Sequence, residues 1–175
     1  KQLTLTVFGD AAIEEDYVAP ALGWAVTQNL PIVFICEDND LSVLTKTEDR
    51  RSWKAVDLAN SLDMYAVDIT DDPWLIAYHV KKISESGKPG FINIRTVRGI
   101  WHAGTGVDND LEWNRYELVE KELSIMGLSK EMNEINIFTD GGRCCRPLFI
   151  VDNGRNLRYS KTNTNKLIKK TYSWY

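Results

Sequence analysis

Two polar side chains follow two strand-like segments at a spacing that could build a metal site. Asp10 comes directly after Gly9 at the end of the first segment, and Asn39 follows the next segment 29 residues later. A strand–helix–strand unit spans about 30 residues, so both side chains are expected at one edge of a parallel sheet, where such sheets bind ligands. Their hard oxygens suit Mg²⁺ or Ca²⁺, and Mg²⁺ held by few protein oxygens usually adds water and phosphate oxygens, which would imply a phosphorylated cofactor. From spacing alone, a helix cap at Asp10 and a turn at Asn39 are the commoner roles.

The elements that would position these side chains alternate between strand and helix signals. Strand signals lie at 2–8, 31–36, 65–69 and 91–97, and helix signals lie at 14–28, 53–62, 73–84 and 111–126. This order predicts an α/β fold with a doubly wound, mostly parallel sheet over residues 1–130. Pro20 fits the first helix only if the regular helix begins about one residue before it, and 37–52 is predicted as a loop.

The last part of the chain differs in charge and pattern. Residues 1–133 carry 13 Lys+Arg against 22 Asp+Glu, whereas 134–175 carry 8 against 3, so the net charge of −4 combines −9 with +5. Three segments of the tail carry strand signals, at 135–139, 147–151 and 156–160. The hairpin signal Asn153-Gly154 lies between the last two of them. We therefore expect two domains, 1–133 and 134–175, the second being a small antiparallel β tail.

Composition excludes several classes of protein. The chain is 26% charged and 10% aromatic, which excludes intrinsic disorder. No apolar run approaches the ~18 residues needed to cross a bilayer, so no membrane partner is expected. The chain begins without Met or a secretory signal, and we expect a processed or excised segment. Its three cysteines cannot all pair and form no Cys-x-x-Cys, which favours a reduced, cytoplasmic compartment.

The residues around Asp10 and Asn39 extend the pattern into a longer motif. The sequence closely resembles the thiamine-diphosphate motif, in which Gly-Asp-Gly is followed by a helix, an apolar strand and Asn-Asn. The matching residues are Gly9-Asp10-Ala11-Ala12-Ile13-Glu14-Glu15, the apolar segment 30–36 and Glu37-Asp38-Asn39. Residues 1–130 are most similar to the α subunits of 2-oxo acid dehydrogenases. The resemblance implies Mg²⁺ ligands at Asp10, Asn39 and the backbone carbonyl of Leu41, and a cofactor site that also includes Gly9, Ala11, Ala12 and Arg98.

Two departures from the motif affect this site. Ala11 replaces its third glycine, which is acceptable if φ stays negative, and Asp38 replaces its first asparagine, which adds negative charge. The resemblance implies that the backbone N–H groups of Ala11 and Ala12 approach the diphosphate at a helix N-terminus.

A second segment, Thr96-Val97-Arg98-Gly99-Ile100-Trp101-His102, resembles the active-site loop of the same family. The resemblance implies that Arg98 contacts the diphosphate and that His102 is catalytic, donating a proton or stabilising an oxyanion. Without it, an ordinary loop histidine and a solvated arginine are the commoner roles. The implied reaction is oxidative decarboxylation of a 2-oxo acid. A β-type partner subunit would supply the carboxylate that activates the cofactor, so the chain alone is expected to be inactive.

The tail resembles a different family. Thr139-Asp140-Gly141-Gly142-Arg143, continuing through Arg146-Pro147 to Val151, is similar to a signature of the second-largest subunit of multisubunit DNA-dependent RNA polymerases, over about 134–175. Two further hypotheses follow: a structural fragment of a polymerase, or a non-catalytic α/β module in a chimeric chain. Basic residues within 143–170 allow nucleic-acid contact, but their irregular spacing favours a solvated surface.

Overall fold

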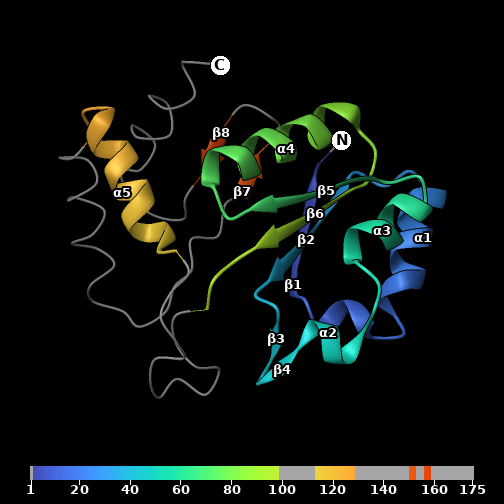
Figure 1. The fold of residues 1–175 in the computed structure, drawn as a ribbon. Coiled ribbons are helices and arrows are strands. Elements are labelled where there is room, and N and C mark those ends of the chain that lie inside the picture. Colours follow the sequence, from blue (N-terminus) through green and yellow to red (C-terminus); the bar gives the residue numbers. More distant parts are fainter. Residues whose placement is uncertain (1, 99–112, 129–149, 153–155, 159–175) are drawn as a thin grey trace. The chain divides into compact units, whose positions relative to one another are not determined.

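The computed structural model of the protein describes residues 2–98, 113–128, 150–152 and 156–158. The chain divides into two compact units, 1–113 and 114–175, which are described separately (Figure 1). None of the helices within these described ranges is long and apolar enough to cross a membrane.

The first unit is built on a sheet of four parallel strands. These are β1 (Thr4–Gly9), β2 (Ile32–Asp38), β5 (Tyr65–Thr70) and β6 (Gly90–Arg95), in the order β1-β2-β6-β5. Helices α1 (Val18–Thr27) and α3 (Ala55–Ser61) cover one face, and α4 (Pro73–Ser86) covers the other (Figure 1). The predicted α/β fold with a doubly wound, mostly parallel sheet is confirmed.

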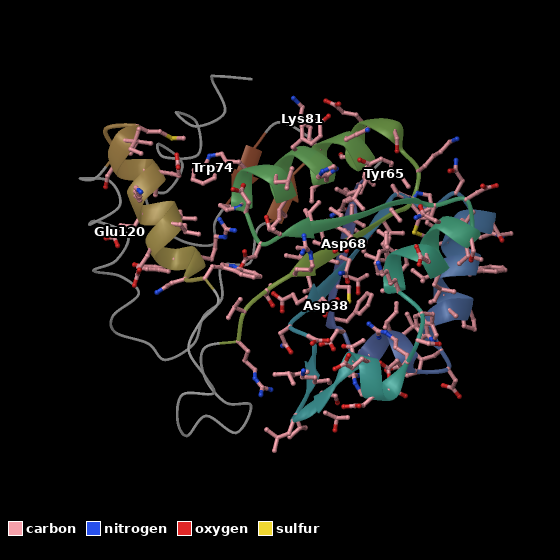
Figure 2. All side chains as sticks on the ribbon, viewed as in Figure 1. Asp38, Tyr65, Asp68, Trp74, Lys81 and Glu120 are labelled. Atoms are coloured by element: carbon pink, nitrogen blue, oxygen red, sulfur yellow. The ribbon has the colours of Figure 1, made fainter. Side chains whose placement is uncertain are left out.

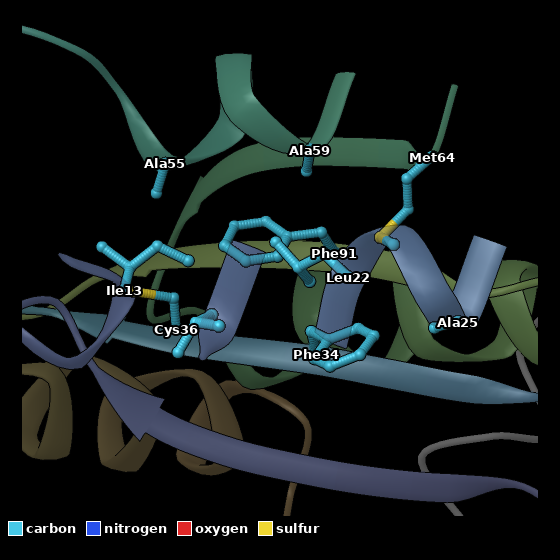
Figure 3. Packing of buried hydrophobic residues seen from close by; sticks show 10 residues of the cluster. Ile13, Leu22, Ala25, Phe34, Cys36, Ala55, Ala59, Met64 and Phe91 are labelled. Carbon is cyan, nitrogen blue, oxygen red and sulfur yellow. The ribbon is translucent and has the colours of Figure 1, made fainter. Parts of the chain in front are cut away.

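The main hydrophobic core lies between the sheet and the two helices on its first face (Figure 3). Leu22 of α1 and Ala59 of α3 are completely buried, and they belong to the same cluster as Phe91 of β6. Apolar burial of this kind stabilises a domain in proportion to the area removed from water. The core therefore fixes the adjacent strands β2 and β6, and with them the edge at which their carboxyl ends emerge.

The ends of α4 follow the signals in the sequence. The Asp72 carboxylate accepts hydrogen bonds from the backbone N–H groups of Trp74 and Leu75, each at 2.9 Å, and Pro73 occupies the first turn. Gly87 ends the helix with φ of +66°, a left-handed conformation that glycine adopts without strain.

The segment after β1 differs from its prediction. A 3₁₀ turn, η1 (Ala12–Glu14), comes first, and α1 begins only at Val18 rather than at residue 14. Pro20 therefore lies in the first turn of α1, where its missing N–H is not needed. The predicted helix start at residue 14 is wrong: the acidic residues 14–16 precede α1, and Glu14 forms ion pairs with two arginines.

The stretch 37–52, predicted as a loop, contains short elements beyond the end of β2. Strands β3 (Leu41–Ser42) and β4 (Thr45–Lys46) form an antiparallel hairpin, and α2 (Thr47–Arg50) follows at once. Two-residue strands and a single helical turn are too short to leave a periodic pattern in the sequence.

The second unit contains α5 (Arg115–Ile125) and the strands β7 (Ile150–Asp152) and β8 (Asn156–Arg158). The two strands pair antiparallel, as predicted for the tail. The predicted strand at 135–139 lies outside the described residues. The structural division places α5 in the second unit, whereas the expected domain boundary lies at 133/134 and stays a prediction.

Candidate functional site

The carboxyl ends of β1 and β2 bring the two predicted metal-binding segments together. Gly9 lies opposite Glu37 in the parallel register, and the backbone N–H of Asp10 donates to the Glu37 carbonyl at 3.2 Å. Asp10 is only 2% exposed. Asp10 therefore lies beside the segment that leads into Asn39, as its spacing predicts.

The carboxylate of Asp10 forms a buried ion pair with Arg50 at the end of α2. Arg50 Nη2 donates to Asp10 Oδ2 at 2.6 Å, and the two side chains are 12% and 3% exposed. Thr47 Oγ1 donates to the same oxygen at 3.4 Å and accepts from Arg50 Nη2 at 3.0 Å. The negative charge of Asp10 is thus balanced by the guanidinium of Arg50. The Asp10 side chain does not cap a helix in this structure.

Arg51 holds the backbone of the same turn. Its Nη1 donates to the Asp10 carbonyl at 2.7 Å and to Glu14 Oε1 at 2.9 Å. The guanidinium carbon lies 4.9 Å from the ring centroid of Trp53, within the range of a cation–π contact. The Arg51 side chain is 3% exposed, and its Nε has no hydrogen-bond partner.

Glu14 connects the two arginines. Arg50 Nη1 lies 2.9 Å from the Glu14 Oε1 atom that also accepts from Arg51, but the Arg50 contact is an ion pair without hydrogen-bond alignment. Two guanidinium groups therefore face two carboxylates, which leaves the cluster of Asp10, Glu14, Arg50 and Arg51 formally neutral.

Asn39 and Leu41 form a turn at the base of the β3–β4 hairpin. Asn39 Oδ1 accepts from the backbone N–H of Leu41 at 3.1 Å, so the side chain has the turn role that spacing alone favoured. The backbone N–H of Thr47 donates to the carbonyl of the intervening residue Asp40 at 3.1 Å. Because Thr47 also reaches the Asp10 carboxylate, it links both predicted metal-binding segments.

The other predicted cofactor residues have mixed outcomes. Ala11 has φ of −75°, so alanine satisfies the condition set for this position. Ala12 begins the three-residue 3₁₀ turn η1, with Ala11 at its N-cap, so the helix N-terminus at this point belongs to a single short turn. The α-helix α1 begins six residues later. Gly9 has no positive φ, and a β-carbon built on it would meet nothing within 4 Å, so open space borders its backbone.

Arg98 lies against the hairpin rather than apart from it. Its Nη1 donates to the Val43 carbonyl, between β3 and β4, at 2.7 Å. The structure thus brings Arg98 to the segment that also contains Asn39 and Leu41. The predicted catalytic residue His102 lies outside the described residues.

A second polar cluster, which the sequence did not predict, joins β2, β6 and β5. Asn93 Nδ2 donates to Asp38 Oδ2 at 3.0 Å and to Asp68 Oδ1 at 3.1 Å. The two aspartates are labelled in Figure 2. Asn93 is 5% exposed, and its Oδ1 is buried without a hydrogen-bond partner. Arg95 Nε lies 3.4 Å from Asp68 Oδ1 near the surface. The amide of Asn93 thus separates two carboxylates at the same edge as Asp10.

Cys36 of β2 lies in the core beneath these charges. Burial raises the pKa of its thiol to about 12, and the negative charges of Asp38 and Asp10 add to the effect. A thiol with so high a pKa is a poor nucleophile and metal ligand, so Cys36 serves packing.

Four residues of these polar clusters were not predicted from the sequence: Thr47, Arg50, Arg51 and Asn93. The adjacent arginines were the available signal, because they stand in a segment otherwise rich in acidic residues. Within the described ranges, no group of three or more His, Cys, Asp or Glu side chains could hold a metal ion. A metal here would depend on amide and carbonyl oxygens beside the single carboxylate of Asp10.

A hollow of about 410 Å³ lies beside η1, lined by residues that include Glu15, Asp16, Trp53 and Leu58. Neither Asp10 nor Asn39 lines it. The hollow borders the ionic cluster through Glu14, which also lines it, but not through the predicted metal ligands.

Comparison with known proteins gives separate results for different parts of the chain. The family described as RNA polymerase Rpb2, domain 4, matches residues 109–152. This match supports the resemblance of the tail and begins well before the expected boundary at 134.

The solved structures give the second result. Transketolase from Campylobacter jejuni matches with a TM-score of 0.52 and 17% identity, over 55% of this chain and 16% of that one. A transketolase from Pichia stipitis matches with a TM-score of 0.50 and 20% sequence identity, over 54% of this chain and 15% of that one. A Mycobacterium smegmatis protein described as thiamin diphosphate-dependent reaches 0.47 and 16%, over 56% and 18%, and carries no weight here. At these identities the likeness shows the fold alone, and the chain spans about a sixth of the transketolase chains.

Proposed function

We propose that the first unit is the part of a thiamine-diphosphate-dependent enzyme that binds Mg²⁺ and the cofactor's diphosphate. One observation carries the proposal: β1 and β2 pair in parallel, so that buried Asp10 hydrogen-bonds to Glu37, two residues before Asn39. The fold likeness to transketolases and the resemblance of the Gly9–Asn39 motif support the same assignment.

The donor set fits Mg²⁺ in its chemistry. Asp10 would contribute a carboxylate oxygen, Asn39 an amide oxygen and Leu41 a backbone carbonyl oxygen, all of them hard donors. The buried Asp10 carboxylate already faces a cation, the guanidinium of Arg50, so this position can stabilise positive charge. The open space beside Gly9 would let a diphosphate approach the backbone closely.

Further residues of the chain would hold the cofactor and handle protons. Arg98, which donates to the Val43 carbonyl of the hairpin, would contact the diphosphate through its guanidinium. His102 would donate a proton or stabilise a developing oxyanion. When bound, thiamine diphosphate supplies a nucleophilic carbon that attacks a substrate carbonyl.

The proposed reaction is oxidative decarboxylation of a 2-oxo acid, on the strength of the motif resemblance. We propose that a β-type partner subunit supplies the carboxylate that activates the cofactor, so that the chain alone binds the cofactor weakly and turns over no substrate.

Calorimetric titration of the full chain with thiamine diphosphate at saturating Mg²⁺ tests the proposal. We expect weak binding that is lost in Asp10→Ala and Asn39→Ala and retained in Asp68→Asn, which alters a carboxylate outside the proposed ligand set. Absence of binding to the wild-type chain, or equal binding by all three variants, would overturn it.

A second candidate function rests on the match of residues 109–152 to the polymerase family. We propose, as the alternative, that the second unit is a structural piece of an RNA polymerase. Nucleic-acid contact by its basic residues would give an affinity for DNA or RNA that falls steeply with salt. An affinity for DNA or RNA that does not change with salt concentration, or binding that involves only the first unit, would exclude such contact.

A further inference from the structure

The ion pair between Arg50 and Asp10 has a consequence for metal binding. Arg50 Nη2 lies 2.6 Å from Asp10 Oδ2, and both side chains are almost fully buried. Mg²⁺ lies about 2.1 Å from a carboxylate oxygen. A metal on the Asp10 carboxylate would therefore stand beside a guanidinium in a buried site, where repulsion between like charges is weakly screened.

We propose that Arg50 is the residue that sets the metal affinity of this site, because it competes with the metal for the Asp10 carboxylate. The inference rests on the proposed function, since it concerns the same Mg²⁺ site. Metal binding then requires Arg50 to give up its hydrogen bond to Oδ2, and the free energy of that bond lowers the observed affinity.

The surroundings of Arg50 allow it to move without becoming isolated. Glu14 Oε1 lies 2.9 Å from Arg50 Nη1, and the Glu14 side chain is 26% exposed. Arg50 Nε is buried without a hydrogen-bond partner, so its present position leaves part of the guanidinium unsatisfied. A displaced Arg50 would keep Glu14 as its counter-charge and could expose Nε to water.

Arg51 does not share this role, although it is adjacent. It donates to the backbone carbonyl of Asp10 and to Glu14, and no contact joins it to the Asp10 carboxylate among the hydrogen bonds and ion pairs described. The two neighbouring arginines therefore have different roles: Arg51 holds the backbone of the turn, and Arg50 pairs with the Asp10 carboxylate.

Titration of the full chain with Mn²⁺ alone, followed by the electron paramagnetic resonance of the free ion, measures the competition. Arg50→Gln removes the competing charge and keeps a polar side chain. A hydrogen bond to a charged group contributes about 1.5–3 kcal/mol, so we expect Mn²⁺ to bind about 10- to 100-fold more tightly than to wild type. Arg95→Gln is the matched control, because Arg95 lies at the same edge but pairs with Asp68, and its affinity should stay close to that of wild type.

Two further variants keep the test decisive. Asp10→Asn should lose the Mn²⁺ binding, with or without Arg50. If Arg50→Gln lowers stability too far, Arg50→Lys keeps the charge but loses the planar group, and its affinity should lie between the two. The shift in melting temperature caused by Mn²⁺ is an independent readout, and it should be larger in Arg50→Gln than in wild type.

The outcomes separate the inference from the proposed function. Tighter binding in Arg50→Gln but not in Arg95→Gln supports the competition. Equal affinities in wild type and Arg50→Gln, with loss in Asp10→Asn, overturn the competition and leave the metal site standing. Equal tightening in both arginine variants also overturns it, because the effect is then one of overall charge. Absence of binding in every variant overturns both the competition and the proposed metal site.

Discussion

Replacing Arg51 by methionine removes the side chain that holds the turn after β1. Methionine is unbranched and apolar, so it fills much of the same buried space but makes neither contact of Nη1, at 2.7 Å to the Asp10 carbonyl and 2.9 Å to Glu14 Oε1. We expect Arg51→Met to lower the free energy of unfolding, and the contacts allow its size to be worked out.

The hydrogen bond to Asp10 joins a charged donor to a buried acceptor, so it contributes about 1.5–3 kcal/mol. The cation–π contact with Trp53 adds about 1 kcal/mol. The loss at Glu14 is small, because that side chain is partly exposed and keeps Arg50. Methionine also ends the burial of a guanidinium with an unpartnered Nε, which offsets part of the loss. The expected net loss is about 2–4 kcal/mol, a large part of the stability of a small domain.

Urea denaturation followed by far-ultraviolet circular dichroism gives the free energy of unfolding for comparison. Arg51→Lys keeps the charge and one donor but loses the planar stack, so about half of the loss should remain. Arg95→Met is the matched control, since Arg95 is 55% exposed and makes a 3.4 Å contact; its change should stay within about 0.5 kcal/mol. A loss in Arg51→Met below about 1 kcal/mol, or no larger than that of the control, would refute the reasoning.

Three further predictions test other parts of the first unit. Gly90→Ala should destabilise the packing of α4 on β6 by about 1–3 kcal/mol in urea denaturation, because its β-carbon would lie 2.5 Å from Ile83; an unchanged midpoint would contradict this. Burial lowers the pKa of His79, and the positive charge of a nearby lysine lowers it further. The free energy of unfolding should therefore keep its full value above the pKa that this histidine has in the unfolded chain, and it should decrease as the pH falls through that value. The decrease should be smaller in His79→Asn. Native Cys36 should react with iodoacetamide at pH 8 at least about tenfold more slowly than in urea, because burial raises the pKa of its thiol and lowers its thiolate fraction; rapid native labelling in a peptide map would contradict this.

The parts of the fold that the sequence predicts depend on local signals. The boundaries of α4 follow from Asp72-Pro73 and Gly87, whose capping roles need no tertiary information. The carboxyl ends of β1 and β2 lie at one edge because strands of a sheet that are joined by a helix run parallel, and sequential strands are usually neighbours, although β6 lies between β2 and β5. These two rules place Asp10 beside the segment of Asn39.

The parts that the sequence missed depend on contacts between distant residues. Arg50 and Asp10 are 40 positions apart and meet only because α2 follows the β3–β4 hairpin directly. The late start of α1 has the same origin, since Glu14 is drawn into ion pairs by residues of α2 and just beyond it. Neither short strands nor a single helical turn leaves a period from which such contacts could be predicted.

The measurement closest to the central claim is paramagnetic broadening in a ¹⁵N–¹H spectrum of the full chain. Mn²⁺ added with thiamine diphosphate should broaden the backbone amide signals of Asp10, Asn39 and Leu41 first, because these residues are the proposed ligands and paramagnetic broadening falls steeply with distance. Signals on the far side of the sheet, such as that of Gly87, should stay sharp. Broadening that first affects Asp68 and Asn93, or that spreads evenly over the acidic surface, would contradict a metal site at the ends of β1 and β2.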